Sequence, residues 1–206
     1  MRKLNPALVV GLLAAVGLWV FSRSRPGEEI IADVFDYGAD AMNSADRNTR
    51  AFLTLIGWSE GTERAADPYR VVYGYKHVIQ DFSDHPAITG EWRGERLPDS
   101  MCASAGLGPG CISTAAGRYQ IIRPTWLAAK DALGLTDFGP ESQDRAALYL
   151  IEKRGALNDV QEGRVSDAVA KVRREWASLP GAGWGQGERP LASLIAAYTT
   201  AGGTLA

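Results

Sequence analysis

AFLTLIGWSEGT, residues 51–62, joins an apolar helical stripe to a carboxylic acid and a glycine. Residues three and four positions apart share one face of a helix, and that face here carries Ala51, Phe52, Leu55 and Ile56. The spacing predicts a helix that starts near Arg47 and ends at Gly61, since glycine is typical of helix C-termini. We expect its apolar face to enter the core of a folded domain.

Glu60 follows Ile56 by four residues, so the predicted helix carries it to the edge of the apolar stripe. Partial burial beside Trp58 would disfavour the ionised carboxylate and raise the pKa of Glu60. A carboxylic acid that keeps its proton near neutral pH is a candidate general acid. The alternative is a solvated or capping glutamate at a helix end.

Composition limits the function classes. The chain has 206 residues, 46% of them apolar and 22% charged, which suits one well-cored domain with an N-terminal appendage. The net charge is −2 and acidic and basic residues are equal in number from Arg47 onward, so we expect no nucleic-acid partner. Two histidines and two cysteines are too few for a Cys/His zinc site, and we expect no metal or other cofactor.

The N-terminus has a basic start, Met1-Arg2-Lys3, followed by an uninterrupted apolar run at 7–21. As a helix this run would span about 22 Å, short of the roughly 30 Å hydrocarbon core of a bilayer. Its many Gly and Ala residues contribute little transfer free energy, so the segment would enter a membrane weakly. We expect residues 1–25 to anchor an exported domain; a cleaved signal peptide and a buried core helix are the alternatives.

The rest of the chain predicts an α+β domain at 47–206 behind an acidic linker or regulatory arm at 26–46. Strand-forming residues predict a β-hairpin of 69–73 with 77–82, which would form one wall of a cleft. A long surface loop is expected between Thr89 and Gly110. Pro or Ser starts and Gly stops predict helices at 124–133, 140–154, 166–176 and 190–201.

Cys102 and Cys111 lie within or beside the long loop. In an oxidising compartment they would close a short disulfide loop, with a chain-entropy benefit of roughly 2 to 3 kcal/mol. Two free thiols are the alternative.

Six ordered motifs resemble those of the lambda-type phage endolysins. They are Trp58-Ser59-Glu60-Gly61-Thr62, Asp81-Phe82-Ser83-Asp84-His85-Pro86, Ser113-Thr114-Ala115-Ala116-Gly117-Arg118-Tyr119-Gln120, Ser142-Gln143-Asp144, Lys153-Arg154-Gly155-Ala156-Leu157 and Trp176-Ala177-Ser178-Leu179-Pro180-Gly181-Ala182-Gly183. The resemblance implies a lysozyme-like fold and cleavage of the β-1,4 bond between N-acetylmuramic acid and N-acetylglucosamine in peptidoglycan. It further implies a lytic transglycosylase with Glu60 as the catalytic acid.

A transglycosylase needs one carboxyl group where a glycoside hydrolase normally uses two. Hydrolytic phage lysozymes of similar fold carry a second acid and a threonine downstream of the glutamate, where this chain has Tyr69 and Tyr75. The nearby acids Glu63, Asp67, Asp81 and Asp84 leave a hydrolytic muramidase open as an alternative. The second alternative is a non-catalytic, membrane-anchored peptidoglycan-binding protein.

The remaining motifs supply candidate substrate-binding residues. Tyr119 and Gln120 follow a glycine, where they would bind sugar hydroxyls and N-acetyl groups or form a purely structural turn. Trp184 and Gln186 lie on a glycine-rich loop; Trp184 would stack on a sugar face and replaces a tyrosine usual in the family. His85 either contacts substrate or fixes its loop.

Arg118 and Asp144 are candidates for an internal ion pair. The apolar N-terminus, joined to such a domain, predicts a signal-anchor-release endolysin that binds peptidoglycan glycan strands as a monomer. Residues 4–21 would engage the host secretion machinery and inner membrane, with the domain facing the periplasm. Membrane depolarisation would then release the enzyme into the periplasm.

Overall fold

The predicted helix forms, and residues 44–60 are helical. The computed structural model describes residues 44–206, so residues 1–25 and the linker up to residue 43 lie outside it. Residues 44–46, assigned from sequence to the linker, belong to the helix. The other α-helices in this part of the chain are α3 (Pro86–Thr89), α4 (Asp99–Ser104), α5 (Arg123–Leu133), α6 (Pro140–Lys153), α7 (Leu157–Gln161), α8 (Val165–Val172) and α9 (Leu191–Thr200).

The apolar stripe of helix 44–60 is the centre of the core. Phe52, Leu55 and Ile56 are fully buried, as the spacing predicted. They share one hydrophobic cluster with Trp126 of α5 and with Phe138. The rings of Trp126 and Phe138 pack edge to face, with their centroids 4.7 Å apart. Fully burying one such side chain stabilises the fold by about 2 kcal/mol, so this stripe fixes the helix and its C-terminal end in place.

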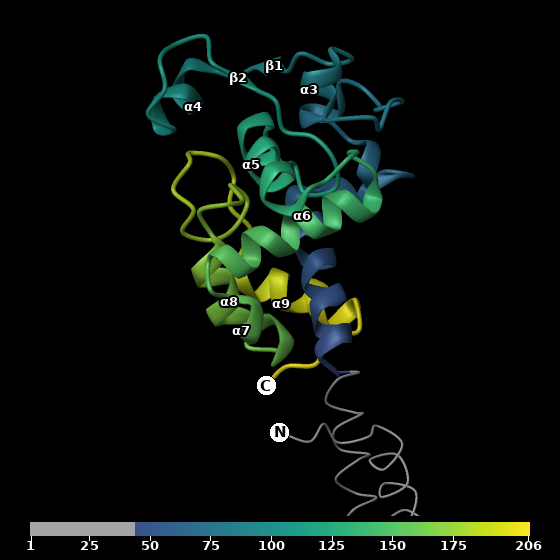
Figure 1. Cartoon of the computed structure of the whole chain (residues 1–206). Helices are drawn as coiled ribbons and strands as arrows, with labels where there is room; N and C mark the ends of the chain where they lie inside the picture. The colour runs from purple at the N-terminus through teal and green to yellow at the C-terminus, as the bar shows by residue number, and fades with distance from the viewer. Residues whose placement is uncertain (1–43) are drawn as a thin grey trace, which may run out of the picture. The chain divides into compact units, whose positions relative to one another are not determined.

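Helices α5 to α9 pack largely in chain order, as Figure 1 shows. Helix α6 contacts both α5 and α7, and α8 contacts both α7 and α9. Short, punctuated connections favour this arrangement because consecutive helices then become neighbours. Helix α6 begins with a proline, and α5 is followed by Gly134 in a left-handed conformation. These are the start and stop residues from which the two helices were predicted.

The predicted hairpin of 69–73 with 77–82 is wrong. Asp67 accepts a hydrogen bond from the Tyr69 backbone N–H, and Pro68 follows at a helical first position, so this segment forms a 3₁₀ turn, Pro68–Arg70. Another 3₁₀ turn, Tyr73–Tyr75, follows, and Val71 with Val78 makes an isolated bridge. Local capping has overridden the strand propensity of these residues.

The long loop expected between Thr89 and Gly110 is also incorrect in part. This region contains α4 and the strand β1 (Glu95–Arg96), which pairs antiparallel with β2 (Ile112–Ser113). A disulfide joins Cys102 of α4 to Cys111 across a sequence separation of nine residues. The fold is therefore mostly helical with a small antiparallel sheet, and the α+β prediction is confirmed with its sheet in a different place.

The predicted helices at 124–133, 140–154 and 190–201 match α5, α6 and α9 within one residue at each end. The helix predicted at 166–176 ends earlier, at Val172, and the buried Trp176 beyond it donates its indole N–H to the Tyr119 carbonyl at 3.0 Å. Helices α3 and α7 were not predicted, because each is only about one turn long. Within residues 44–206 no helix combines the length and apolarity needed to cross a bilayer.

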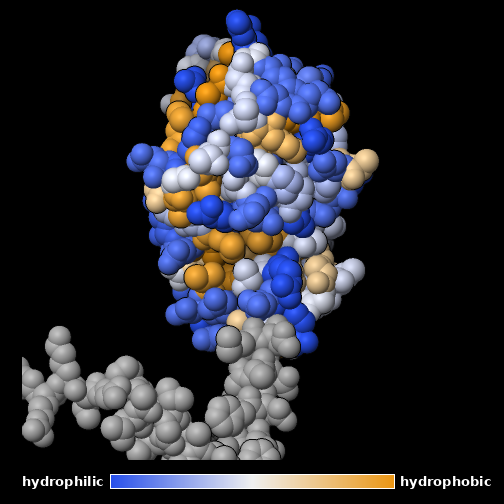
Figure 2. Space-filling view, turned by 45° about the vertical axis from the view of Figure 1, so that its right-hand side comes forward, coloured by the Kyte–Doolittle hydropathy of each residue, from blue (hydrophilic) through white to orange (hydrophobic). Residues whose placement is uncertain are grey.

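Figure 2 shows one face of the surface coloured by hydropathy. Hydrophilic residues cover most of this face, and a band of hydrophobic residues crosses its lower half. The exposed large hydrophobic side chains include Val78 and Ile112. Such scattered exposure is ordinary for a folded domain.

Gly117 offers a test of the packing under the cleft. Its backbone is left-handed (φ 75°), and a Cβ would overlap the side-chain amide of the buried Gln143. We expect Gly117→Ala to lower the free energy of unfolding by about 3 kcal/mol, combining backbone strain with a displaced buried amide. Urea denaturation measures this loss.

Gly134→Ala is the matched control, since Gly134 is also left-handed (φ 62°) but has open space where a Cβ would be. It should lose only about 1 kcal/mol. Equal losses in the two variants would contradict the proposed clash with Gln143.

Candidate active site

Glu60 is the last residue of helix 44–60, and Gly61 ends the helix in a left-handed conformation (φ 82°). The Gly61 N–H donates to the Trp58 carbonyl at 3.0 Å, which turns the chain away from the helix axis. Ile56, one turn earlier, is fully buried. The helix therefore delivers Glu60 to the boundary of the core, as its spacing predicted.

Glu60 faces a cleft of about 350 Å³, a size typical of small ligand sites. Four segments far apart in the sequence form its walls: the end of helix 44–60, the turn region 71–75, Gln120, and the segment 178–189. The lining residues are Ser59, Glu60, Val71, Val72, Tyr73, Gly74, Tyr75, Gln120, Ser178, Gln186, Gly187 and Arg189.

The surroundings of Glu60 favour its protonated form. Burial raises the pKa of the Glu60 carboxyl, and this effect exceeds the opposing influence of hydrogen bonds from Ser178 and the charge of Arg189. The Ser178 hydroxyl lies 2.6 Å from Glu60 Oε1 and 2.9 Å from the Ser59 hydroxyl. The side chain is half-buried, so it still reaches the cleft. The arrangement is that of a general acid held against an open space.

Arg189 joins the two segments that surround Glu60. Its backbone N–H donates to the Ser178 carbonyl at 2.7 Å, and its Nε donates to the Ser59 carbonyl at 3.3 Å. The guanidinium also lies over the Trp58 ring, 5.7 Å from the ring centroid. Sequence reasoning missed this residue, because a single arginine before a proline carries no pattern that marks it.

Among the described residues lining the cleft, Glu60 is the only carboxylic acid. Each of the other candidate acids is engaged elsewhere. Glu63 pairs with Arg118 at 2.6 Å, and Asp67 caps its own turn. Asp81 accepts the Ser83 N–H, and Asp84 accepts from the Trp126 indole and Lys130. Among the described candidate acids, Glu60 is therefore the one whose carboxyl group faces the cleft.

Residues 50–205 match the model of the family described as Endolysin. That match covers well over half of the chain. The chain belongs to the endolysin family.

Two similar proteins are the endolysins of Escherichia phage lambda, 39% identical, and of Escherichia phage P2, 40% identical. The first alignment covers 80% of this chain and 97% of the lambda protein, and the second 76% and 94%. A solved structure of bacteriophage lambda lysozyme complexed with a chitohexasaccharide is similar at a TM-score of 0.65 and 39% identity, over 78% of this chain and 97% of that one. The predicted lysozyme-like fold and lambda-type resemblance are confirmed.

Two of the predicted substrate-binding residues of this endolysin, Gln120 and Gln186, do line the cleft with Glu60. Gln120 has a left-handed backbone (φ 47°), unusual for a residue other than glycine. Its amide donates to the Gly117 carbonyl at 3.0 Å and to the Val71 carbonyl at 3.3 Å. It therefore ties the turn to the opposite wall while it borders the cleft.

The prediction that Tyr119 binds substrate is wrong, because its side chain is fully buried. Its hydroxyl donates to Asp144 at 2.6 Å, and the Tyr69 hydroxyl donates to the same carboxylate oxygen at 2.9 Å. The predicted Arg118–Asp144 ion pair is also incorrect. Arg118 contacts both tyrosine hydroxyls at 3.1 Å, so these hydroxyls stand between the two charges.

His85 is fully buried as well, so the prediction of a substrate contact is wrong and the loop-fixing alternative holds. Its Nδ1 accepts the Ala87 N–H at 3.1 Å as the N-cap of α3, which leaves Nε2 to donate to the Ile121 carbonyl at 3.0 Å. Burial lowers the pKa of His85 to about 4. The histidine is a neutral structural group.

Trp184 is half-buried and does not line the cleft around Glu60. The glycine-rich loop that carries it is held by Glu188, whose carboxylate accepts the Gly181 N–H at 2.8 Å and the Gly183 N–H at 3.0 Å. Sugar stacking by Trp184 stays a prediction. In residues 44–206 no three metal-ligating side chains gather in one place.

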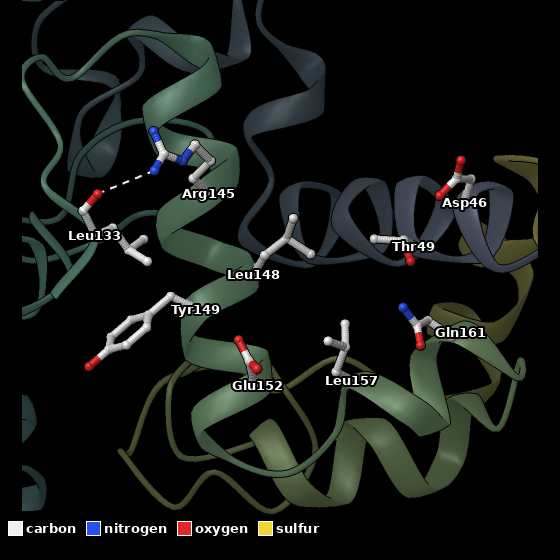
Figure 3. A pocket seen from close by; sticks show the side chains of 9 residues that line it. All are labelled: Asp46, Thr49, Leu133, Arg145, Leu148, Tyr149, Glu152, Leu157 and Gln161. Carbon is white, nitrogen blue, oxygen red and sulfur yellow. Dashed lines mark hydrogen bonds between the residues drawn. The ribbon is translucent and has the colours of Figure 1, made fainter. Parts of the chain in front are cut away.

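A second cavity, of about 360 Å³, lies between helix 44–60, α6 and α7 (Figure 3). Leucine side chains contribute much of its wall, and Arg145 donates to the Leu133 carbonyl at 3.2 Å. Its two carboxyl groups, on Asp46 and Glu152, belong to exposed residues. The cleft at Glu60 is therefore the candidate active site.

The buried neutral His85 predicts a pH dependence of stability. His85 takes up a proton around pH 6.5 in the unfolded chain but only near pH 4 in the folded chain. The free energy of unfolding therefore falls as the pH drops between these values. We expect a loss of about 3 kcal/mol from this group. In His85→Asn, whose side chain can keep the cap, that part of the loss should vanish.

Denaturation by urea at pH 7 and at pH 4 in both proteins measures the difference. An equally steep loss in the variant would show that His85 is not the group responsible.

Proposed function

We propose that this endolysin cleaves the β-1,4 bond between N-acetylmuramic acid and N-acetylglucosamine in peptidoglycan, for lysis of a bacterial host, with Glu60 as the catalytic acid. One observation carries the proposal: the half-buried Glu60 carboxyl, its pKa raised by burial, is the only acid among the described residues lining the cleft. The similarity to a lambda lysozyme complexed with a chitohexasaccharide supports an amino-sugar glycan as ligand.

We infer that the product is a 1,6-anhydromuramic acid. Glu60 donates its proton to the glycosidic oxygen as the bond from that oxygen to C1 breaks. The resulting carboxylate then accepts the proton of the muramic acid C6 hydroxyl while that oxygen bonds to C1. The proton returns to Glu60 and no water is consumed, so a second carboxylate is not required. Hydrolysis would normally require one.

The cleft walls suit a sugar ring. The two glutamine amides, on Gln120 and Gln186, face the same space as the aromatic residues Tyr73 and Tyr75. Amides bond hydroxyl and N-acetyl groups, and aromatic rings pack on the apolar faces of sugars. The Tyr75 hydroxyl donates to the Gly61 carbonyl, which holds its ring beside the acid.

Glu60→Gln tests the role of the acid. The amide has the same shape and no acidic proton, so we expect turnover of purified peptidoglycan to fall by a factor of about 10² to 10⁴. Glu141→Gln is the matched control, because it makes the same change at an exposed position in the first turn of α6 and should leave turnover intact. Undiminished turnover in Glu60→Gln would remove this residue from the mechanism.

Mass spectrometry of the released muropeptides tests the chemistry itself. We expect products that lack one water relative to reducing-end muropeptides, because an internal hydroxyl replaces water as the nucleophile. Products with only reducing ends would make the enzyme a hydrolytic muramidase. Binding of peptidoglycan with no products from the parent enzyme would instead favour a non-catalytic role.

We further propose that the enzyme is exported by the host secretion machinery and held at the inner membrane by residues 1–25, which lie outside the described residues. The small-residue composition of the run at 7–21 favours reversible insertion. The Cys102–Cys111 disulfide fits an oxidising compartment such as the periplasm. Release on membrane depolarisation would then free a monomeric enzyme into the periplasm.

Replacing several Gly and Ala residues of this run with leucine tests release. Each added apolar group strengthens membrane binding, so we expect the variant to stay in the membrane fraction after depolarisation and lysis to be delayed. Fractionation and culture turbidity report both effects. Release of active enzyme from the leucine-enriched anchor as efficient as from the parent would contradict the proposal.

A further inference from the structure

A chain of oxygen atoms leads from the Glu60 carboxyl back into helix 44–60. Glu60 Oε1 lies 2.6 Å from the Ser178 hydroxyl, which lies 2.9 Å from the Ser59 hydroxyl. The Ser59 hydroxyl in turn lies 2.8 Å from the Ile56 carbonyl oxygen. Both serines are buried, with 2% of Ser59 and 8% of Ser178 exposed. Their protons therefore have to be shared along this chain rather than with bulk water.

The number of protons differs between the two states of Glu60. Each hydroxyl has one proton to donate, so the two serines supply two protons for three oxygen contacts. With Glu60 ionised, Ser178 donates to the carboxylate, and the one Ser59 proton goes either to the Ser178 oxygen or to the Ile56 carbonyl. With a proton on Oε1, Glu60 donates to Ser178, Ser178 donates to Ser59, and Ser59 donates to the Ile56 carbonyl. All three contacts are hydrogen bonds only in the second state.

We propose that Ser178 and Ser59 form a hydroxyl relay whose direction depends on whether Glu60 Oε1 carries a proton, with Ser178 as a positioning residue of the acid. This inference rests on the proposed role of Glu60 as proton donor. Because Ser178 engages Oε1, the relay leaves Oε2 for the substrate. When the acidic proton stands on Oε2, the serines already point as in the ionised form. The carboxylate left after proton transfer is therefore stabilised without side-chain reorganisation.

The other charged or titratable side chains lining the cleft are Arg189, Tyr73 and Tyr75. Arg189, which donates hydrogen bonds to the Ser59 and Ser178 carbonyls, brings a positive charge close to Glu60. Tyr73 and Tyr75 come from the opposite wall, and their hydroxyls contact Met101 and the Gly61 carbonyl. These groups leave the two serines as the ones that change hydrogen-bond direction with Glu60.

The relay predicts opposite effects for two chemically identical substitutions. Ser178→Ala removes the hydroxyl donor to the carboxylate and keeps the backbone donor of residue 178. Because hydrogen bonds to charged groups are stronger than neutral ones, Glu60 should titrate about 1 pH unit higher. Ser59→Ala removes the acceptor that Ser178 uses when Glu60 is protonated. Ser178 then donates only to Glu60, the ionised form gains, and the titration should move roughly 0.5 pH unit lower.

Carbon-13 NMR of glutamate carboxyls in the full-length protein, in detergent, measures the titration directly; the Glu60 signal is the one lost in Glu60→Gln. Ser142→Ala is the matched control, since Ser142 is similarly buried (6% exposed) and bonds Asp137 away from the cleft. Its Glu60 titration should equal that of the parent. Shifts of the same sign in Ser178→Ala and Ser59→Ala, or none in either, would overturn the relay.

Activity supplies a second readout that a purely structural role would not move. The high-pH limb of kcat/KM for peptidoglycan cleavage reports loss of the acidic proton, and it should follow the NMR shifts: higher in Ser178→Ala and lower in Ser59→Ala. A high-pH limb of kcat/KM that shifts in the opposite direction to the NMR titration of the same variant would also contradict the relay. The NMR titration needs no turnover, so the relay can be judged even if Glu60→Gln stays active and the proposed function fails.

Discussion

The hydrogen bond between the Glu60 carboxyl and the Ser178 hydroxyl, 2.6 Å long, joins residues 118 positions apart in the chain. Around it, Arg189 binds carbonyl groups of both partners' segments. Trp176, just before Ser178, is buried and fixed to the Tyr119 carbonyl. The cleft exists because the C-terminal third of the chain folds back over the end of helix 44–60. That packing both desolvates the acid and supplies its hydrogen-bond donor.

A partly buried polar network supports the other side of the cleft. Arg118 bonds Glu63, both tyrosine hydroxyls at Tyr69 and Tyr119, and Thr54, and the two tyrosines converge on Asp144. Groups in such a network are costly to bury singly but stabilise one arrangement when every partner is present. The network holds the turn that presents Gln120 and occupies Glu63. Glu60 is thus the acid left free to react.

The region 89–113 reaches both walls of the cleft. Met101 of α4 lies 4.0 Å from the Tyr73 hydroxyl, and the side chain of Ser104 fills the space where Gly185 lacks a Cβ. The loop around Gly185 rises toward α4 in Figure 1. The Cys102–Cys111 disulfide and the β1–β2 pair give this short region order that its few core contacts would not supply.

Several features followed from the sequence because their causes are local. Helical spacing and punctuation gave helix 44–60, α5, α6 and α9, and the position of Glu60 after Ile56 placed it at the core edge. The hairpin was wrong because Asp67 and Pro68 cap a turn that strand propensity does not register. Burial of Tyr119 and His85 could not be read from motifs, since a polar residue serves equally well in a core network or a binding site. The sequence indicated a raised pKa for Glu60 from its place at the core edge, but its contact with Ser178 and the hydrogen bonds of Arg189 were decided only by the tertiary structure. They depend on long-range packing, which brings desolvation and donors to one point.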